Sequence, residues 1–97
     1  MELKRVVVTG LGALTPIGKD VPSTWDALTK GVSGAGPITH FDASKFRCQI
    51  AAELKGFNPL DYFDKKETRL LDGYTMYGII TVDEAMRDAG FTDTNID

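Results

Sequence analysis

The sequence predicts an α/β fold whose elements run strand, helix, strand and long helix along the chain. Three observations support this prediction: a β-branched run at residues 6–8, an amphipathic stretch at residues 21–30, and a longer amphipathic stretch after Asp64. The chain has 97 residues, which is enough for one small domain at most. A chain of this length buries only a modest part of its surface, so we expect it to be marginally stable on its own.

The composition is that of an ordinary globular protein, with 42% hydrophobic and 26% charged residues. The formal net charge of −3 and the scatter of the basic residues argue against a nucleic-acid partner. No stretch approaches the ~20 apolar residues that a membrane helix needs, and the first residues lack the apolar region of a signal peptide. A single cysteine, Cys48, excludes an internal disulfide and suits a reducing compartment. We therefore expect a cytoplasmic protein without membrane contact.

The first element is predicted to be a strand at residues 6–8, because a continuous run of valines is typical of a strand buried on both faces. Glycines and a proline in residues 10–18 then indicate a loop. A helix is expected at residues 21–30, with Pro22 in its first turn and Gly31 just beyond its end. Its apolar face is formed by Val21, Trp25, Leu28 and Val32.

The glycines of this loop do not match the nucleotide-binding motifs that they resemble. A dinucleotide-binding fingerprint needs Gly or Ala where Thr15 stands, and Pro16 prevents the helix start that would hold the pyrophosphate. A P-loop needs four residues between its glycines and Ser or Thr after its lysine. Here five residues separate Gly12 from Gly18, and Asp20 follows Lys19. Neither motif is present.

The second half of the chain predicts a weak strand and a long helix. Alternation at residues 50–54 favours a strand. Asp64 and Glu67 form the pattern of a capping box, and an apolar face continues from there to Gly90. We expect one helix of about 25 residues, roughly 37 Å long. Gly73 and Gly78 lie inside it, and each costs ~1 kcal/mol relative to Ala.

The side chains with reactive or metal-binding chemistry are few. One cysteine and one histidine cannot form a familiar zinc site within this chain. Nothing around Cys48 indicates an activated nucleophile, so we interpret it as a small apolar residue. His40 is interpreted as a structural hydrogen-bonding group.

The cations Lys65, Lys66 and Arg69 are crowded into the start of the predicted long helix, where the helix dipole disfavours positive charge. Asp64 and Glu67 offset part of this effect. One interpretation is a solvated polar face. The other is an electrostatic docking patch for an acidic partner.

The segment VVVTGLGALTPIG at residues 6–18 resembles the opening of the β-ketoacyl-ACP synthases of the type II kind, and of their synthase II group in particular. The likeness covers essentially the whole chain, so residues 1–97 resemble the N-terminal segment of a β-ketoacyl synthase N-terminal domain, incomplete and without a second domain. The motifs that carry it are residues 4–18, 25–28, 31–34, 38–42, 57–58, 65–67, 83–85 and 88–90.

The resemblance implies a thiolase-like fold of layered αβαβα type, of which this chain would supply only the N-terminal part of the first half. It implies an acyltransferase of fatty acid biosynthesis, usually a homodimer, that needs no metal or redox cofactor. Such enzymes condense an acyl group held on cysteine with malonyl-ACP by a decarboxylative Claisen reaction, and the product is 3-oxoacyl-ACP.

The same resemblance implies that the catalytic cysteine and both histidines lie beyond residue 97, since Cys48 and His40 do not match their positions. We therefore expect no catalytic, cofactor-binding or metal-binding residue in this chain. The acyl carrier protein is the implied partner. Lys66 and Arg69 match the cations that meet it in the family, and Lys65 adds to them.

Two alternatives share the implied fold: a ketosynthase of a polyketide synthase, and a catalytically inactive chain-length-factor subunit. The match at residues 65–67 favours the fatty acid enzyme. Leu70, Gly73 and Met76 depart from residues that are common in the family, which bears on how strongly the patch would dock.

Overall fold

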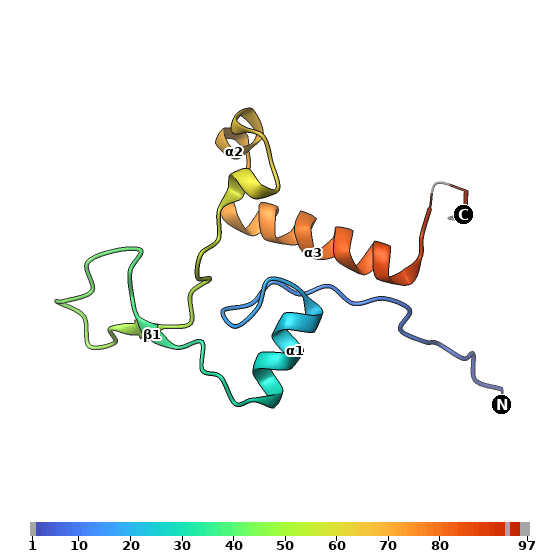
Figure 1. Ribbon diagram of the computed structural model, residues 1–97, viewed down its shortest axis with the longest axis horizontal. Helices are drawn as coiled ribbons and strands as arrows, with labels where there is room; N and C mark the ends of the chain where they lie inside the picture. Colours follow the sequence, from blue (N-terminus) through green and yellow to red (C-terminus); the bar gives the residue numbers. More distant parts are fainter. Residues whose placement is uncertain (1, 93, 96–97) are drawn as a thin grey trace.

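A computed structural model describes residues 2–92, 94 and 95. In this part of the chain, helices and a short two-stranded ribbon form an open arrangement (Figure 1). The elements in order are α1 (Val21–Thr29), β1 (Gly36–Pro37), β2 (Ile50–Ala51), the 3₁₀ helix η1 (Pro59–Asp61), α2 (Lys65–Leu70) and α3 (Gly73–Ala89).

Helix α1 follows the prediction for residues 21–30 to within one residue. Asp20 caps its start: the carboxylate accepts a hydrogen bond from the Ser23 N–H at 2.9 Å, and Ser23 Oγ accepts one from the Asp20 N–H at 3.2 Å. The helix ends before Gly31, whose φ of 70° only glycine adopts easily. The predicted apolar face is present but open, since Trp25 is 64% exposed.

The predicted buried strand at residues 6–8 is wrong for the described structure. These valines are exposed, with Val6 at 89% and Val8 at 80%, and no strand is present there. A strand exists only through hydrogen bonds to a neighbour, and the described residues supply no neighbour at this point. A valine run indicates the tendency of a segment to pair, but it does not provide the partner.

The ribbon pairs β1 with β2 antiparallel, in the register Gly36 with Ala51 and Pro37 with Ile50. The strand predicted at 50–54 is therefore confirmed only over its first two residues, and no strand was predicted at its partner, Gly36–Pro37. Pro37 has no N–H to donate, which limits the ladder. The chain beyond Ala51 makes side-chain contacts instead, because Glu53 binds Thr39.

The single helix predicted for residues 65–90 is wrong, because the structure has two helices there. Leu71 and Asp72 are extended, with ψ of 133° and 158°, and they separate α2 from α3. Asp72 occupies the N-cap of α3 and Gly73 its first position, so an Asp-Gly pair ends one helix and begins the next. The capping box of Asp64 and Glu67 at the start of α2 is confirmed.

The described residues bury little of their surface. Of their hydrophobic side chains, Ala43 and Met76 are the buried ones, each 8% exposed. The accessible surface is 8131 Å², whereas a folded monomer of this mass would have about 5,500 Å². The radius of gyration is 17.4 Å, against about 12.5 Å for a compact domain of this length. The apolar faces of α1 and α3 therefore have room for further protein.

None of the helices in the described ranges combines the length and the apolar character that a membrane crossing requires.

Candidate functional site

The predicted docking patch lies on α2, a short helix that stands apart from the N-terminal half of the chain (Figure 1). Lys65, Lys66 and Arg69 are all exposed. No ion pair among the described residues involves these three cations. The structure therefore places the three residues of the predicted docking patch within one and a half turns of helix, with their charged groups exposed to solvent.

Helix α2 is held in place by its capping box and by its contact with η1. The Glu67 N–H donates to Asp64 Oδ1 at 2.7 Å, and the Asp64 N–H donates to Glu67 Oε2 at 3.1 Å. These two carboxylates face the N-terminal end of α2, where the helix dipole favours negative charge. They do not neutralise the cations by direct pairing.

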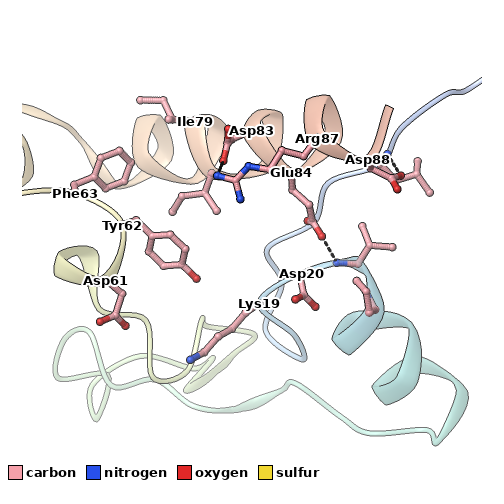
Figure 2. A pocket seen from close by; sticks show the side chains of 14 residues that line it. Lys19, Asp20, Asp61, Tyr62, Phe63, Ile79, Asp83, Glu84, Arg87 and Asp88 are labelled. Atoms are coloured by element: carbon pink, nitrogen blue, oxygen red, sulfur yellow. Dashed lines mark hydrogen bonds and ion pairs between the residues drawn. The ribbon is translucent and has the colours of Figure 1, made fainter. Parts of the chain in front are cut away.

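A cleft of about 1010 Å³ lies between α3, η1 and the start of α1 (Figure 2). Its walls combine apolar, acidic and basic side chains. Its lining includes Leu11, Val21, Tyr62, Ile80, Asp83 and Glu84. The guanidinium of Arg87 pairs with Asp83 one turn earlier on α3, so the charge of this arginine is already matched.

Glu84 and Asp88 connect α3 to the N-terminal segment. The Glu84 carboxylate accepts hydrogen bonds from the Ala13 N–H at 2.8 Å and from the Val21 N–H at 2.9 Å. Asp88 Oδ2 accepts one from the Leu11 N–H at 3.0 Å. Both carboxylates lie on one face of the helix, four residues apart. They position the loop after the valine run and the first turn of α1 (Figure 2).

The glycines that resemble a nucleotide-binding motif lie where the N-terminal loop crosses α3. A Cβ at Gly10 would lie 2.2 Å from the carbonyl oxygen of Ala85, and one at Gly12 would lie 1.9 Å from that of Thr81. The backbone of the loop therefore packs directly on the backbone of α3, at a separation that only glycine allows. This packing explains the Gly-x-Gly spacing without a ligand.

Sequence reasoning missed this pair of carboxylates. The available signal was Glu84 and Asp88 at helical spacing on a face that is otherwise apolar and small, where acidic side chains need a partner. The donors were not foreseeable, because they are backbone groups of the glycine loop and of the start of α1, more than 60 residues away.

Cys48 and His40 lie on the loop between β1 and β2, away from the cleft. Cys48 is exposed, and its thiol donates to the Ile50 carbonyl oxygen at 3.3 Å. His40 Nε2 lies 3.5 Å from Glu53 Oε2. The Thr39 hydroxyl, then the Thr39 N–H, lower the pKa of Glu53, and His40 adds to this effect. His40 thus lies beside the Thr39–Glu53 contact at the base of this loop.

Within the described residues, no three His, Cys, Asp or Glu side chains are grouped so that they could hold a metal ion.

Comparison with known proteins gives three concordant results. Residues 3–97 match the family model described as "Beta-ketoacyl synthase, N-terminal domain". The chain is 50% identical over 86 residues to a protein of Staphylococcus aureus (strain COL) named 3-oxoacyl-[acyl-carrier-protein] synthase 2; the match covers 89% of this chain and 21% of that protein. A protein of the same name from Synechocystis sp. is 43% identical over 89 residues, which cover 92% of this chain and 21% of the relative.

Among solved structures, the chain is similar to one described as "The ishigamide ketosynthase/chain length factor". The TM-score is 0.80 at 31% identity, over 93% of this chain and 22% of the other. The chain thus spans about a fifth of the length of the relatives that it matches.

Proposed function

Because the chain belongs to the β-ketoacyl synthase family, through that family's N-terminal domain, we propose that it is the opening segment of a condensing enzyme of fatty acid biosynthesis. The observation that carries this proposal is the match over residues 3–97 together with 50% identity to a 3-oxoacyl-[acyl-carrier-protein] synthase 2. The longer protein would be a cytoplasmic homodimer with the layered αβαβα arrangement, and residues 6–8 would form a strand of its first sheet.

The proposed reaction joins two acyl groups. An acyl group moves from the carrier protein to a cysteine thiolate and forms an enzyme thioester. Malonyl-ACP then loses CO₂, and the electron pair of the broken carbon–carbon bond attacks the thioester carbonyl. The thiolate leaves, and 3-oxoacyl-ACP is released two carbons longer. Two histidines and an oxyanion hole would stabilise the charges that develop.

In this proposal the nucleophile and both histidines belong to polypeptide outside residues 1–97. We assign no catalytic role to Cys48, because the residues around it do not match the family's nucleophile. The contributions of this chain are structural support and carrier docking.

The experiment is to express the longer protein and supply acyl-ACP with malonyl-ACP. We expect CO₂ release and a 3-oxoacyl-ACP product, whereas residues 1–97 alone should give neither. Condensation by residues 1–97 alone would contradict the proposal.

A catalytically inactive chain-length-factor subunit is the second candidate, and the similarity to a ketosynthase/chain length factor structure favours it. Such a subunit would form no acyl-enzyme thioester when incubated with labelled acyl-ACP. A polyketide ketosynthase would form the thioester and would extend other acyl chains. The labelled intermediate and its product therefore separate the three functions.

We propose Lys65, Lys66 and Arg69 as the carrier-docking patch. Its support is the exposure of these residues on α2 and the absence of an ion pair to them within residues 2–92, 94 and 95. The double variant Lys66→Glu, Arg69→Glu in the longer protein should slow association with acyl-ACP about tenfold at low salt, and less at high salt. Lys4→Glu, an exposed cation on the N-terminal segment, is the control. An unchanged association rate at low salt would count against the patch.

A further inference from the structure

The chain between β1 and β2 forms an arm, defined here as residues 38–49, that projects from the rest of the molecule (Figure 1). The ribbon closes the base of the arm, and the Ile38 N–H donates to the Gln49 carbonyl oxygen at 3.0 Å. Beside it, Thr39 donates through its hydroxyl to Glu53 at 2.6 Å. The described contacts therefore hold both ends of the arm together.

The tip of the arm is also held in one shape. The Ser44 N–H donates to Asp42 at 3.0 Å, and the Phe46 N–H donates to the Ala43 carbonyl oxygen at 3.0 Å. The Gln49 side chain donates to the carbonyl oxygens of Ser44 and Phe46, each at 3.2 Å. A loop fixed in this way loses little conformational entropy when it binds a partner.

This tip presents two aromatic rings with cations beside them. Phe41 and Phe46 pack edge to face, with centroids 5.8 Å apart, yet they remain 56% and 60% exposed. Lys45 and Arg47 flank Phe46 and are exposed, in a chain whose net charge is −3. Aromatic residues and arginine are the residue types enriched at the centres of protein interfaces.

The charges at the tip distinguish between two kinds of partner. The Ser44 N–H, and then its hydroxyl, lower the pKa of Asp42 and so stabilise its ionised form. An ionised carboxylate beside Phe41 opposes insertion of the rings into an anionic lipid surface. A protein surface can place a donor opposite Asp42 and acidic groups opposite Lys45 and Arg47.

We propose that the arm is a second docking contact for the same acidic carrier protein that α2 recruits. This inference rests on the proposed function. Figure 1 shows the arm and α2 in the half of the molecule opposite residues 2–5 and the C-terminal end of α3. In this arrangement α2 supplies long-range attraction, and the arm supplies the apolar contact that slows release.

The test compares two sets of variants of the longer protein in association and dissociation measurements with acyl-ACP. Lys45→Glu with Arg47→Glu should slow association about fivefold at low salt. Phe41→Ser with Phe46→Ser should leave association unchanged and speed dissociation about fivefold. The controls are Lys4→Glu for charge and Phe91→Ser, another exposed phenylalanine, for apolar area.

The outcomes are separable. If the α2 variants weaken binding and the arm variants change neither rate, the arm proposal is overturned and the proposed function stands. If the phenylalanine variants lower the melting temperature while binding is unchanged, the arm is covered by other parts of the protein and the proposal is likewise overturned. If the wild type sediments with phosphatidylserine vesicles, the arm variants do not, and the same variants bind acyl-ACP normally, then the arm binds lipid and the carrier proposal is overturned. Failure of the wild type to bind acyl-ACP at all would overturn the proposed function itself.

Discussion

Glu84 is the residue on which the geometry of the N-terminal segment most depends. Its two carboxylate oxygens accept from two backbone amides that belong to different elements, the glycine loop and α1. An ionised acceptor strengthens each bond, and a backbone N–H left unpaired beside a helix would be destabilising. Asp88, one turn later, adds a third such bond from Leu11.

Replacement of Glu84 by Gln should therefore destabilise the longer protein by about 1.5–3 kcal/mol. The glutamine amide retains one oxygen acceptor for one backbone N–H. Its NH₂ group is itself a donor and would face the other backbone N–H, which would then lack an acceptor. Asp83→Asn is the matched control on the same helix, because it breaks only an exposed pair with Arg87, worth less than about 1 kcal/mol. Thermal denaturation of both variants measures the difference, and equal melting temperatures would contradict the role of Glu84.

Two glycines should respond in opposite ways to the same substitution. Gly12→Ala should destabilise by about 1–3 kcal/mol or more, because the added Cβ meets the Thr81 carbonyl group. Gly78→Ala should stabilise by about 0.5–1 kcal/mol, because nothing lies within 4 Å of the added Cβ and alanine favours the helix interior. Urea denaturation of the longer protein gives both values. Destabilisation by Gly78→Ala would instead show that another surface approaches α3 there.

At the scale of elements, the sequence predicted what local chemistry determines. The glycine just beyond α1, Gly31, and the capping box at Asp64 depend on residues within one turn, and both predictions are confirmed. The N-cap at Asp20 is equally local but was not among the predictions. The break between α2 and α3 was also local, since Leu71 and Asp72 are extended and Asp72 occupies the N-cap position of α3, without a capping hydrogen bond from its side chain. It was missed because the apolar spacing continues across it.

Other features could not be predicted because they depend on distant partners. The pairing of Gly36 with Ala51 and the bonds to Glu84 join segments that no local pattern connects. The valine run at residues 6–8 has the local tendency to form a strand, but the described residues provide no strand for it to pair with. For the docking patch, the sequence placed the cations on a helix start, and the structure adds their exposure. Their binding to a carrier remains a prediction.

The base of the arm should be sensitive to acid. Thr39, and to a smaller extent His40, lower the pKa of Glu53 in the folded state. The stabilisation is fully present above the ordinary glutamate pKa of about 4.3, and it is lost as the pH falls through the lower folded value.

Hydrogen–deuterium exchange of residues 36–51, corrected for the intrinsic effect of pH, should show the arm opening as the pH falls below the ordinary pKa of glutamate. In Glu53→Gln this transition should be absent, and Thr39→Val should shift it to higher pH. A profile independent of pH in the wild type would exclude this role of Glu53.

At the scale of the whole molecule, the exposed area is the informative quantity. The surface of 8131 Å² exceeds that of a compact monomer by about 2,700 Å². That excess is more than the roughly 800 Å² that each partner contributes to a standard interface. Much of it is apolar, on α1, α3 and the valine run. These faces are suited to packing within the larger layered fold proposed for the family.

Residues 1–97 produced alone should consequently lack a cooperative thermal transition and should bind the dye ANS, because their apolar faces stay open. In the longer protein, the amides of residues 6–8 should be protected from hydrogen exchange by pairing in a sheet. Circular dichroism and exchange mass spectrometry make both comparisons. A sharp unfolding transition of the isolated piece would show that it covers its own surface.

The carboxylate contacts of α3 also set the order of events during synthesis. Val21 binds a residue 63 positions later, and Leu11 binds one 77 positions later. At about 5–20 residues per second, a ribosome needs roughly 3 to 13 s to reach Glu84 after it has made Val21. During that interval the backbone amides of Leu11, Ala13 and Val21 lack the carboxylates that they bind in the structure. The glycine loop can therefore take its final position only after α3 has been synthesised.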